Sequence, residues 1–285
     1  MKIPKRLIPL LEDGLIDSVE RQLLSGKEAT VYVVRCGSDT RCAKVYKDAG
    51  QRSFKQAVEY REGRKDRNSR RARAMEKGSR FGRKQLEESW HNAEVDALYK
   101  LAAADVRVPK PYGCFDGVLL MELVTDADGD VAPRLNDIEL TQEQARDGHA
   151  LMMDYAVKML CAGLVHGDLS EFNVLQDEDG PVIIDLPQAV DAAANNHAKT
   201  LFMRDVNNMT AYYGQYLPEL LTTDYANEIW ALYEDGDLHP GCTLTGEFEQ
   251  TLAAADVDSV LNEISAAYDE EQERLQRING GDDDD

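Results

Sequence analysis

Long apolar stretches are missing from this sequence. No window approaches the roughly 18 apolar residues that a membrane-spanning helix needs. The first residues, MKIPKRLIPLLEDG, combine basic residues with a short apolar patch. Glu12 and Asp13 interrupt that patch and no small-residue cleavage site follows, so the segment does not look like a secretory signal. We therefore expect a cytoplasmic protein that makes no membrane contact.

Residues that build disulfides or metal sites are also scarce. The five cysteines are odd in number and form no C-x-x-C pair, which argues against a disulfide framework and against a thiolate zinc site. The five histidines are scattered, and no two have the i, i+4 spacing of a helical metal pair. We expect reduced thiols that are mostly buried.

Positive charge is scarce overall and concentrated in one stretch. Lys and Arg total 32 against 53 Asp and Glu, a formal net charge of −21. From Arg61 to Lys84, eleven basic residues face three acidic ones, a local balance of +8. The stretch is polar and almost free of large apolar residues, so we expect a flexible basic insertion at about residues 48–85. The last residues, 279–285, are typical of a disordered acidic tail.

The order of apolar patterns predicts strands first and helices later. Residues 18–47 contain three short runs rich in Val, Tyr and Leu, separated by turn residues, which indicates an antiparallel meander. Helical spacing follows at residues 86–101, and a hairpin is expected at Asp116-Gly117. Residues 141–144 resemble a capping box that opens a long helix.

This order predicts a two-lobed α+β fold, because strands dominate the first third and helices the remainder. An antiparallel sheet would form the N-terminal lobe, residues 1–120, and helices most of the C-terminal lobe, residues 121–278. The lobes would meet near Met121 to Val124.

Three polar residues stand in a strongly apolar part of the chain. Asp168 and Asn173 lie in VHGDLSEFNVL, and Asp185 ends the run VIID. A hairpin over residues 173–185 would bring Asn173 and Asp185 side by side, as two oxygen ligands of the kind that Mg²⁺ prefers. Asp168 would face whatever the metal holds. This arrangement suits phosphoryl transfer, in which a metal neutralises phosphate charge and a carboxylate orients or deprotonates the acceptor hydroxyl.

A cation for the remaining phosphates is available in Lys44, within the apolar strand RCAKVYK. A lysine in such a setting is costly to bury without a partner, and Glu94 on the following helix is the candidate. Each signal alone has a plain explanation: an H-x-D turn at the surface, a strand lysine with an exposed head, a solvated helix glutamate. Their order along the chain is the order found in protein kinases.

Between residues 18 and 215 the sequence resembles the RIO family of atypical protein kinases, in particular its RIO1 branch. SGKEATVY is similar to the family's S-T-G-K-E-A-x-V-Y nucleotide loop, AKVYK to its lysine strand and LLMELV to its hinge. HGDLSEFN is similar to the H-x-D-L-S-E-Y-N catalytic loop, and IIDLPQAV to the I-I-D-x-x-Q metal loop. The combination of these motifs is highly specific.

The resemblance implies a protein-kinase-like fold and a serine/threonine kinase that transfers the γ-phosphate of ATP to a serine hydroxyl. It implies that Asp168 is the catalytic base and that Asn173 and Asp185 hold Mg²⁺ or Mn²⁺. By the same resemblance, Lys44 paired with Glu94 would align the phosphates.

The resemblance also implies which residues contact the nucleotide. The G-x-G-x-x-G loop of ordinary kinases is absent, so phosphate contact would depend on Ser25, Lys27 and backbone N–H groups around Gly26. The hinge backbone at Met121, Glu122 and Leu123 would bind adenine.

Two departures from ordinary protein kinases leave the acceptor open. Asp185 is followed by Leu-Pro-Gln in place of D-F-G, and there is no A-P-E motif. The family likewise lacks the activation and peptide-binding segments. How a protein substrate docks is therefore open, the chain itself is one candidate acceptor, and an ATPase acting as a conformational switch is another possibility.

Two alternative functions would involve other partners. HGDL also begins the motif of aminoglycoside and choline kinases, although those continue with His-Pro-Gly-Asn; a small-molecule kinase would need an acceptor pocket, for which Glu219, Asp224, Trp230 and Tyr233 are candidates. Ribosome maturation is the usual context of the RIO family, so Arg61 to Lys84 could bind RNA or a ribosomal precursor. The same stretch could equally be a solvated insertion.

Overall fold

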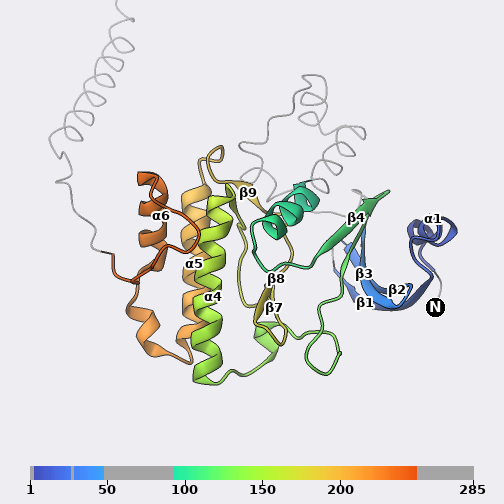
Figure 1. Ribbon diagram of the computed structural model, residues 1–285, viewed down its shortest axis with the longest axis horizontal. Coiled ribbons are helices and arrows are strands. Elements are labelled where there is room, and N and C mark those ends of the chain that lie inside the picture. Colours follow the sequence, from blue (N-terminus) through green and yellow to red (C-terminus); the bar gives the residue numbers. More distant parts are fainter. Residues whose placement is uncertain (1–2, 27–28, 48–92, 249–285) are drawn as a thin grey trace, which may run out of the picture. The chain divides into compact units, whose positions relative to one another are not determined.

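Five strands form one antiparallel sheet in the order β1-β2-β3-β5-β4 (Figure 1). The computed structural model of the protein describes residues 3–26, 29–47 and 93–248, all within the first of two compact units, Met1–Phe248. The first three strands are the expected meander, and β5 then pairs with β3. The strands are Ser18–Ser25 (β1), Ala29–Cys36 (β2), Asp39–Tyr46 (β3), Pro111–Phe115 (β4) and Val118–Glu122 (β5).

Both faces of this sheet carry apolar contacts. On one face, Leu10 of the N-terminal segment packs in a cluster with Val45 of β3. On the other face, Tyr46 belongs to the larger core that includes Leu98 of the helical segment 93–103. Side chains alternate along a strand, so β3 sends residues 43 and 45 one way and 44 and 46 the other. The N-terminal helical elements are η1 (Lys5–Leu7) and α1 (Ile8–Glu12).

Two local predictions from the sequence are confirmed. The β4–β5 hairpin turns at Asp116 and Gly117, whose φ angles of 46° and 76° suit a tight two-residue turn. The long helix α4 (Gln142–Cys161) begins with a capping box: Gln144 N donates to Thr141 Oγ1 at 3.2 Å, and Thr141 N donates to Gln144 Oε1 at 2.9 Å.

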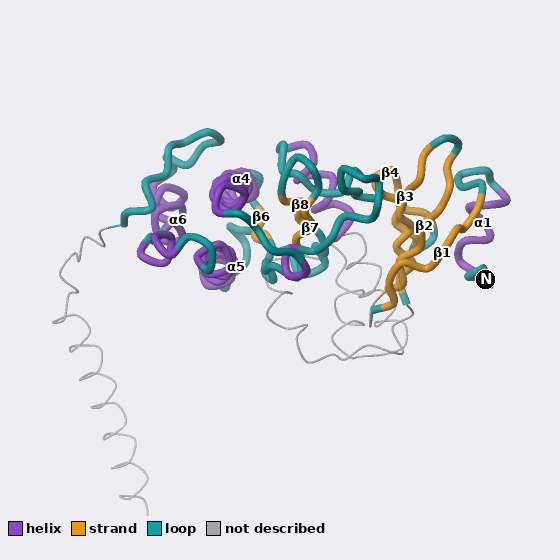
Figure 2. The backbone as a smooth tube through the Cα atoms, turned by 90° about the horizontal axis from the view of Figure 1, so that it is seen from below, coloured by secondary structure: helices purple, strands orange, loops and turns teal. Residues whose placement is uncertain are grey.

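Most of the regular secondary structure in the described residues after β5 is helical. The helices α4 and α5 lie side by side in both views (Figures 1 and 2). Helix α6 packs on α5 through Trp230 and Phe202, whose ring centroids are 5.5 Å apart. The elements are η4 (Leu135–Asp137), β6 (Leu164–Val165), β7 (Val174–Gln176), β8 (Pro181–Ile183), β9 (Val190–Asp191), α5 (Ala198–Gly214), η5 (Pro218–Thr222) and α6 (Tyr225–Asp235).

The cysteines are free, as expected, but they are not mostly buried. Cys42 is buried, whereas Cys114 and Cys161 are exposed. Cys114 lies on β4, at an edge of the sheet, and Cys161 is the last residue of α4, so each sits where an element meets solvent. Within the described ranges, no helix is long and apolar enough to cross a membrane.

Several expectations concern residues that the structure does not describe. They are the basic insertion at residues 48–85, the part of the predicted C-terminal lobe at residues 249–278, and the acidic tail at residues 279–285.

Candidate active site

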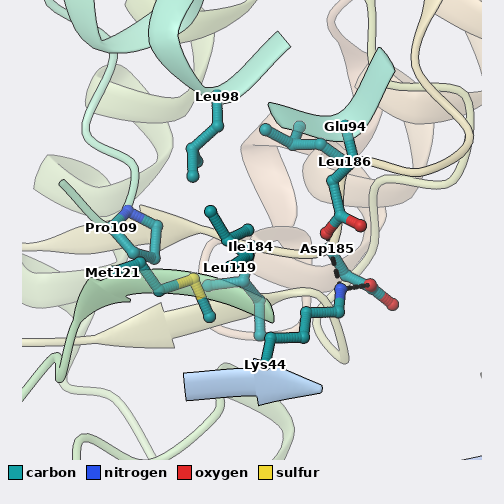
Figure 3. A pocket seen from close by; sticks show the side chains of 9 residues that line it. All are labelled: Lys44, Glu94, Leu98, Pro109, Leu119, Met121, Ile184, Asp185 and Leu186. Atoms are coloured by element: carbon teal, nitrogen blue, oxygen red, sulfur yellow. Dashed lines mark hydrogen bonds and ion pairs between the residues drawn. The ribbon is translucent and has the colours of Figure 1, made fainter. Parts of the chain in front are cut away.

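Lys44 joins two carboxylates that come from distant parts of the chain. Its Nζ lies 2.5 Å from Glu94 Oε1 and 3.0 Å from Asp185 Oδ1 (Figure 3). Lys44 stands on β3, Glu94 on the helical segment 93–103, and Asp185 two residues after β8 ends. The structure thus brings together three of the residues that the sequence singled out.

The Lys44–Glu94 pair is largely removed from water. The side chains of Lys44 and Glu94 are 13% and 6% exposed, respectively. Tyr46, two residues along β3 and therefore on the same side, donates its hydroxyl to Glu94 Oε2 at 2.6 Å. Burial alone would lower the pKa of Lys44, but Glu94 and Asp185 outweigh it and raise that pKa. Lys44 is therefore a fixed positive charge at neutral pH.

Asp185 has an unusual backbone and lies close to the loop that carries Asp168. Its φ of 66° lies in the left-handed region, which Asp tolerates better than most residues. His166 Nδ1 accepts the N–H of Asp168, so the ring proton is on Nε2, which donates to the carbonyl of Ile184 at 3.1 Å. Burial would raise the pKa of Asp185, but Lys44 reverses this and lowers it. Asp185 is thus an ionised carboxylate.

Asp168 and Asn173 lie in the loop between β6 and β7. Asn173 Nδ2 donates to the carbonyl of Asp168 at 2.7 Å and reaches its Oδ2 at 3.4 Å. The expected hairpin is present, because β7 pairs with β8 and Ile184 N donates to Asn173 O at 3.0 Å. Asn173 is therefore paired with the residue that precedes Asp185. A donor to Asp168 that the sequence did not single out is Gln188, whose Nε2 lies 3.2 Å from Oδ2.

A buried aspartate on α5 anchors the loop that carries Asp168. Asp205, only 3% exposed, accepts the N–H groups of Gly167 and Leu169, the second at 3.0 Å. Burial raises the pKa of Asp205 to about 6, although both N–H groups work against this. Arg204 and Asn208 on the same helix donate to the carbonyls of Gly167 and Leu169. The backbone on either side of Asp168 is thereby held by α5.

Ser25 and Gly26, at the end of β1, are bonded by a lysine that was not predicted. Gly26 N donates to Ala29 O at 2.9 Å, which ties the end of β1 to the start of β2. Lys47, just after β3, donates to Gly26 O at 2.5 Å and to Ser25 Oγ at 3.3 Å. Lys47 therefore adds a positive charge beside this loop. Lys27 lies outside the described residues.

A pocket opens beside the lysine, with an apolar wall and a charged end. Met121 belongs to the apolar wall (Figure 3). The amide of Glu122 already donates to Lys110 O at 2.9 Å, so an adenine contact at Glu122 would use its carbonyl. The Glu122 side chain forms two bonds of 2.8 Å with Arg107, which also reaches Asp177 at 2.8 Å. The lining residues are Lys44, Glu94, Leu98, Pro109, Leu119, Met121, Ile184, Asp185 and Leu186.

The side chains present suit a divalent cation held together with phosphate. In the described part of the chain, no cluster of three or more His, Cys, Asp or Glu side chains could hold a metal ion. Asn173 and Asp185 offer two oxygens. Mg²⁺ is commonly held in this way, by one or two protein oxygens together with substrate phosphates and water.

The residues considered for a small-molecule acceptor pocket have other uses. Asp224 caps α6 by accepting from Asn227, and Trp230 packs in the core against Phe202. Glu219 is exposed, with an ion pair of 3.7 Å to Arg146. These contacts account for three of the four side chains as a helix cap, a core residue and a surface residue, and the fourth, Tyr233, packs against Trp230 with ring centroids 5.2 Å apart.

A model of the RIO domain family matches residues 30–226 of the chain. The chain belongs to the RIO family. The RIO-type serine/threonine-protein kinase Rio1 of Haloferax volcanii is 33% identical over 237 residues, covering 80% of this chain and 74% of that protein. The Rio1 kinase of Methanocaldococcus jannaschii is 31% identical over 191 residues, covering 66% and 60%. The human kinase RIO1 is 28% identical over 218 residues, covering 76% of this chain but 37% of the human protein.

These relatives belong to the RIO1 branch, as does this chain. The fold is accordingly that of a two-lobed α+β RIO kinase. The match covers 37% of the human protein, so most of that protein lies outside the match with this chain. Tyr46, Lys47 and Gln188 could have been noticed in the sequence, because they stand inside the AKVYK and IIDLPQAV motifs. Asp205 and Arg107 carry no motif signal.

Proposed function

We propose that this chain is a RIO-type serine/threonine protein kinase that transfers the γ-phosphate of ATP to a serine hydroxyl with the help of Mg²⁺ or Mn²⁺. The observation that carries the proposal is Lys44, a buried cation shared by Glu94 and Asp185 at the charged end of an apolar pocket. The names of the relatives support the reaction and give no support to a small-molecule acceptor.

Each residue then has a chemical role. The adenine ring would lie against the hinge, Met121 to Leu123, and the phosphates beside Lys44 and the loop at Ser25 to Lys27. Asn173 and Asp185 would supply the oxygens for the cation, which neutralises phosphate charge. Asp168 would accept the proton of the acceptor hydroxyl while that oxygen bonds to the γ-phosphorus and the β,γ-bridging bond breaks to release ADP.

The experiment uses purified protein, γ-labelled ATP and Mg²⁺, with label followed on the protein and in free phosphate. We expect Asp168→Ala to lower transfer by roughly 10²- to 10⁴-fold, the range for losing a general base. Asp154→Ala, which removes an aspartate paired with Lys158 on the surface of α4, is the matched control and should behave as wild type. Equal turnover by wild type and Asp168→Ala would refute the proposed role of Asp168.

The acceptor and partners extend this proposal. Label on the chain itself would indicate autophosphorylation, and label only in phosphate would favour the ATPase switch. We further propose that the lobes divide near residues 120–121, that the protein acts in the cytoplasm, and that Arg61 to Lys84 contact RNA or a ribosomal precursor. RNA affinity that falls steeply with salt would support the last point, because displaced counterions set that slope.

A further inference from the structure

The carboxylate of Asp168 is held by amide groups on one oxygen only. Within the described residues, both side-chain amide donors, Gln188 Nε2 at 3.2 Å and Asn173 Nδ2 at 3.4 Å, reach Oδ2. The Asn173 amide makes its shorter bond, 2.7 Å, to the backbone carbonyl of Asp168. Gln188 is therefore the closer of the two side-chain donors to this carboxylate.

Gln188 lies in a turn that is anchored by buried residues. It lies three residues after Asp185, in a turn closed by the bond from Ala189 N to Leu186 O at 3.0 Å. Leu186 is 1% exposed and Ala189 is 5% exposed, so the residues at both ends of the turn are buried. Gln188 itself is half-buried, whereas Asp168 is exposed. The turn that holds Gln188 thus belongs to the same segment as Asp185. The Gln188 side chain reaches Asp168, which lies in the loop between β6 and β7.

We propose that Gln188 is a positioning residue for phosphoryl transfer, which fixes the plane of the Asp168 carboxylate so that Oδ1 faces the acceptor hydroxyl. An exposed carboxylate can otherwise rotate about its Cβ–Cγ bond. A donor on Oδ2 removes that freedom, and a hydrogen bond to an ionised acceptor is stronger than a neutral one. Holding a base in its productive orientation lowers the barrier to transfer without changing nucleotide contacts. This inference rests on the proposed function.

The position also couples the two halves of the site. Asp185 and Gln188 belong to one segment, so the segment that would supply an oxygen for the cation also carries the amide that reaches Asp168. The sequence contains both residues in IIDLPQAV, but it does not reveal that the glutamine reaches Asp168, which lies 20 positions earlier.

Steady-state kinetics with γ-labelled ATP test this role in the full-length protein. We expect Gln188→Ala to lower kcat by roughly 10- to 100-fold, as for the loss of one hydrogen bond to a charged group, with KM for ATP changed by less than about twofold. Gln188→Glu keeps the size of the side chain but places an acceptor against the carboxylate, so its kcat should fall at least as far. Gln176→Ala is the matched control, because Gln176 is another half-buried glutamine, which donates to a backbone carbonyl at 3.1 Å.

The outcomes separate this inference from the proposed function. If the wild-type protein transfers no label to protein or to water, the proposed kinase function is refuted. An active wild type with unchanged kcat in both Gln188 variants would overturn the role of Gln188 alone. So would a rise in KM for ATP at constant kcat, or an equal loss in Gln176→Ala. Gln188→Glu keeps the test decisive if Gln188→Ala does not fold.

Discussion

Removing the charge of Lys44 should destabilise the protein strongly, and more so at neutral than at acidic pH. The Glu94 side chain is 6% exposed, and Lys44→Met would leave it with the hydroxyl of Tyr46 but without its cation. Breaking a buried ion pair by removing one partner costs about 3–5 kcal/mol. Asp185, whose side chain is 51% exposed, keeps its hydration and should add little. We therefore expect Lys44→Met to lose about 3–5 kcal/mol of unfolding free energy at pH 7.5.

The stability loss in Lys44→Met should depend on pH, and the titration of the carboxyl groups gives the direction of that dependence. Lys44 lowers the pKa of Asp185 in the folded state, so this group contributes stability above its unfolded pKa, which is lost as pH falls through the folded value. A buried carboxyl group without its cation also takes up a proton more readily. The first effect acts only below the unfolded pKa of Asp185, about 3.9, and so lies outside the range from pH 7.5 to pH 5. The second effect stabilises Lys44→Met as the pH falls and therefore shrinks its difference from wild type within that range. The loss at pH 5 should therefore be smaller than at pH 7.5.

Urea unfolding followed by tryptophan fluorescence at both pH values is the assay. The matched control is Lys199→Met, whose partner Glu234 forms an ion pair with both side chains about half exposed, and such pairs contribute about 0–1 kcal/mol. Adding Glu94→Gln to Lys44→Met should recover part of the loss. A Lys44→Met protein within about 1 kcal/mol of wild type at pH 7.5, or one with equal losses at both pH values, would refute the reasoning.

Two further predictions concern residues that the sequence did not reveal. Arg107→Ala breaks the bonds to Glu122 and Asp177. We expect it to lower the unfolding free energy, measured in urea, by about 1.5–3 kcal/mol. Arg107→Lys should not restore this loss, because lysine cannot form the bidentate pair. Asp205→Asn should lower kcat, because an amide cannot accept the N–H groups of Gly167 and Leu169 through both of its groups. Burial raises the pKa of Asp205 to about 6, so its contribution to stability is present below its unfolded pKa of roughly 3.9 and is lost as pH rises through about 6. Asp205→Asn should flatten the urea-derived stability curve over this range.

The Arg107 and Asp205 predictions can each be contradicted by one specific result. Full recovery by Arg107→Lys would mean that charge alone, and not the paired geometry, holds Glu122 and Asp177. An unchanged kcat in Asp205→Asn, together with an unchanged slope of stability between pH 4 and 6, would show that α5 does not anchor the loop around Asp168 through this side chain.

Short-range features of the chain could be predicted because their partners are neighbours in sequence. The capping box at Thr141 and Gln144 needs residues three apart, and the hairpin at Asp116-Gly117 needs a turn that tolerates positive φ. The cysteines show the limit of composition. Cysteine is among the most buried residue types, yet Cys114 is exposed because its strand forms an edge of the sheet.

The sequence by itself determined which chemical groups are available and in what order, since the spacing of Asp168 and Asn173 already brings these two into contact within one loop. Only the tertiary structure decided which distant groups meet. Lys44 lies 50 residues from Glu94 and 141 from Asp185. Glu94 looks like a solvated helix residue until the helix packs on β3, and Asp205 holds amides 36 and 38 positions away. The physical reason is that charge and hydrogen-bonding capacity belong to a residue, whereas burial and partners arise from packing between elements that local sequence does not encode.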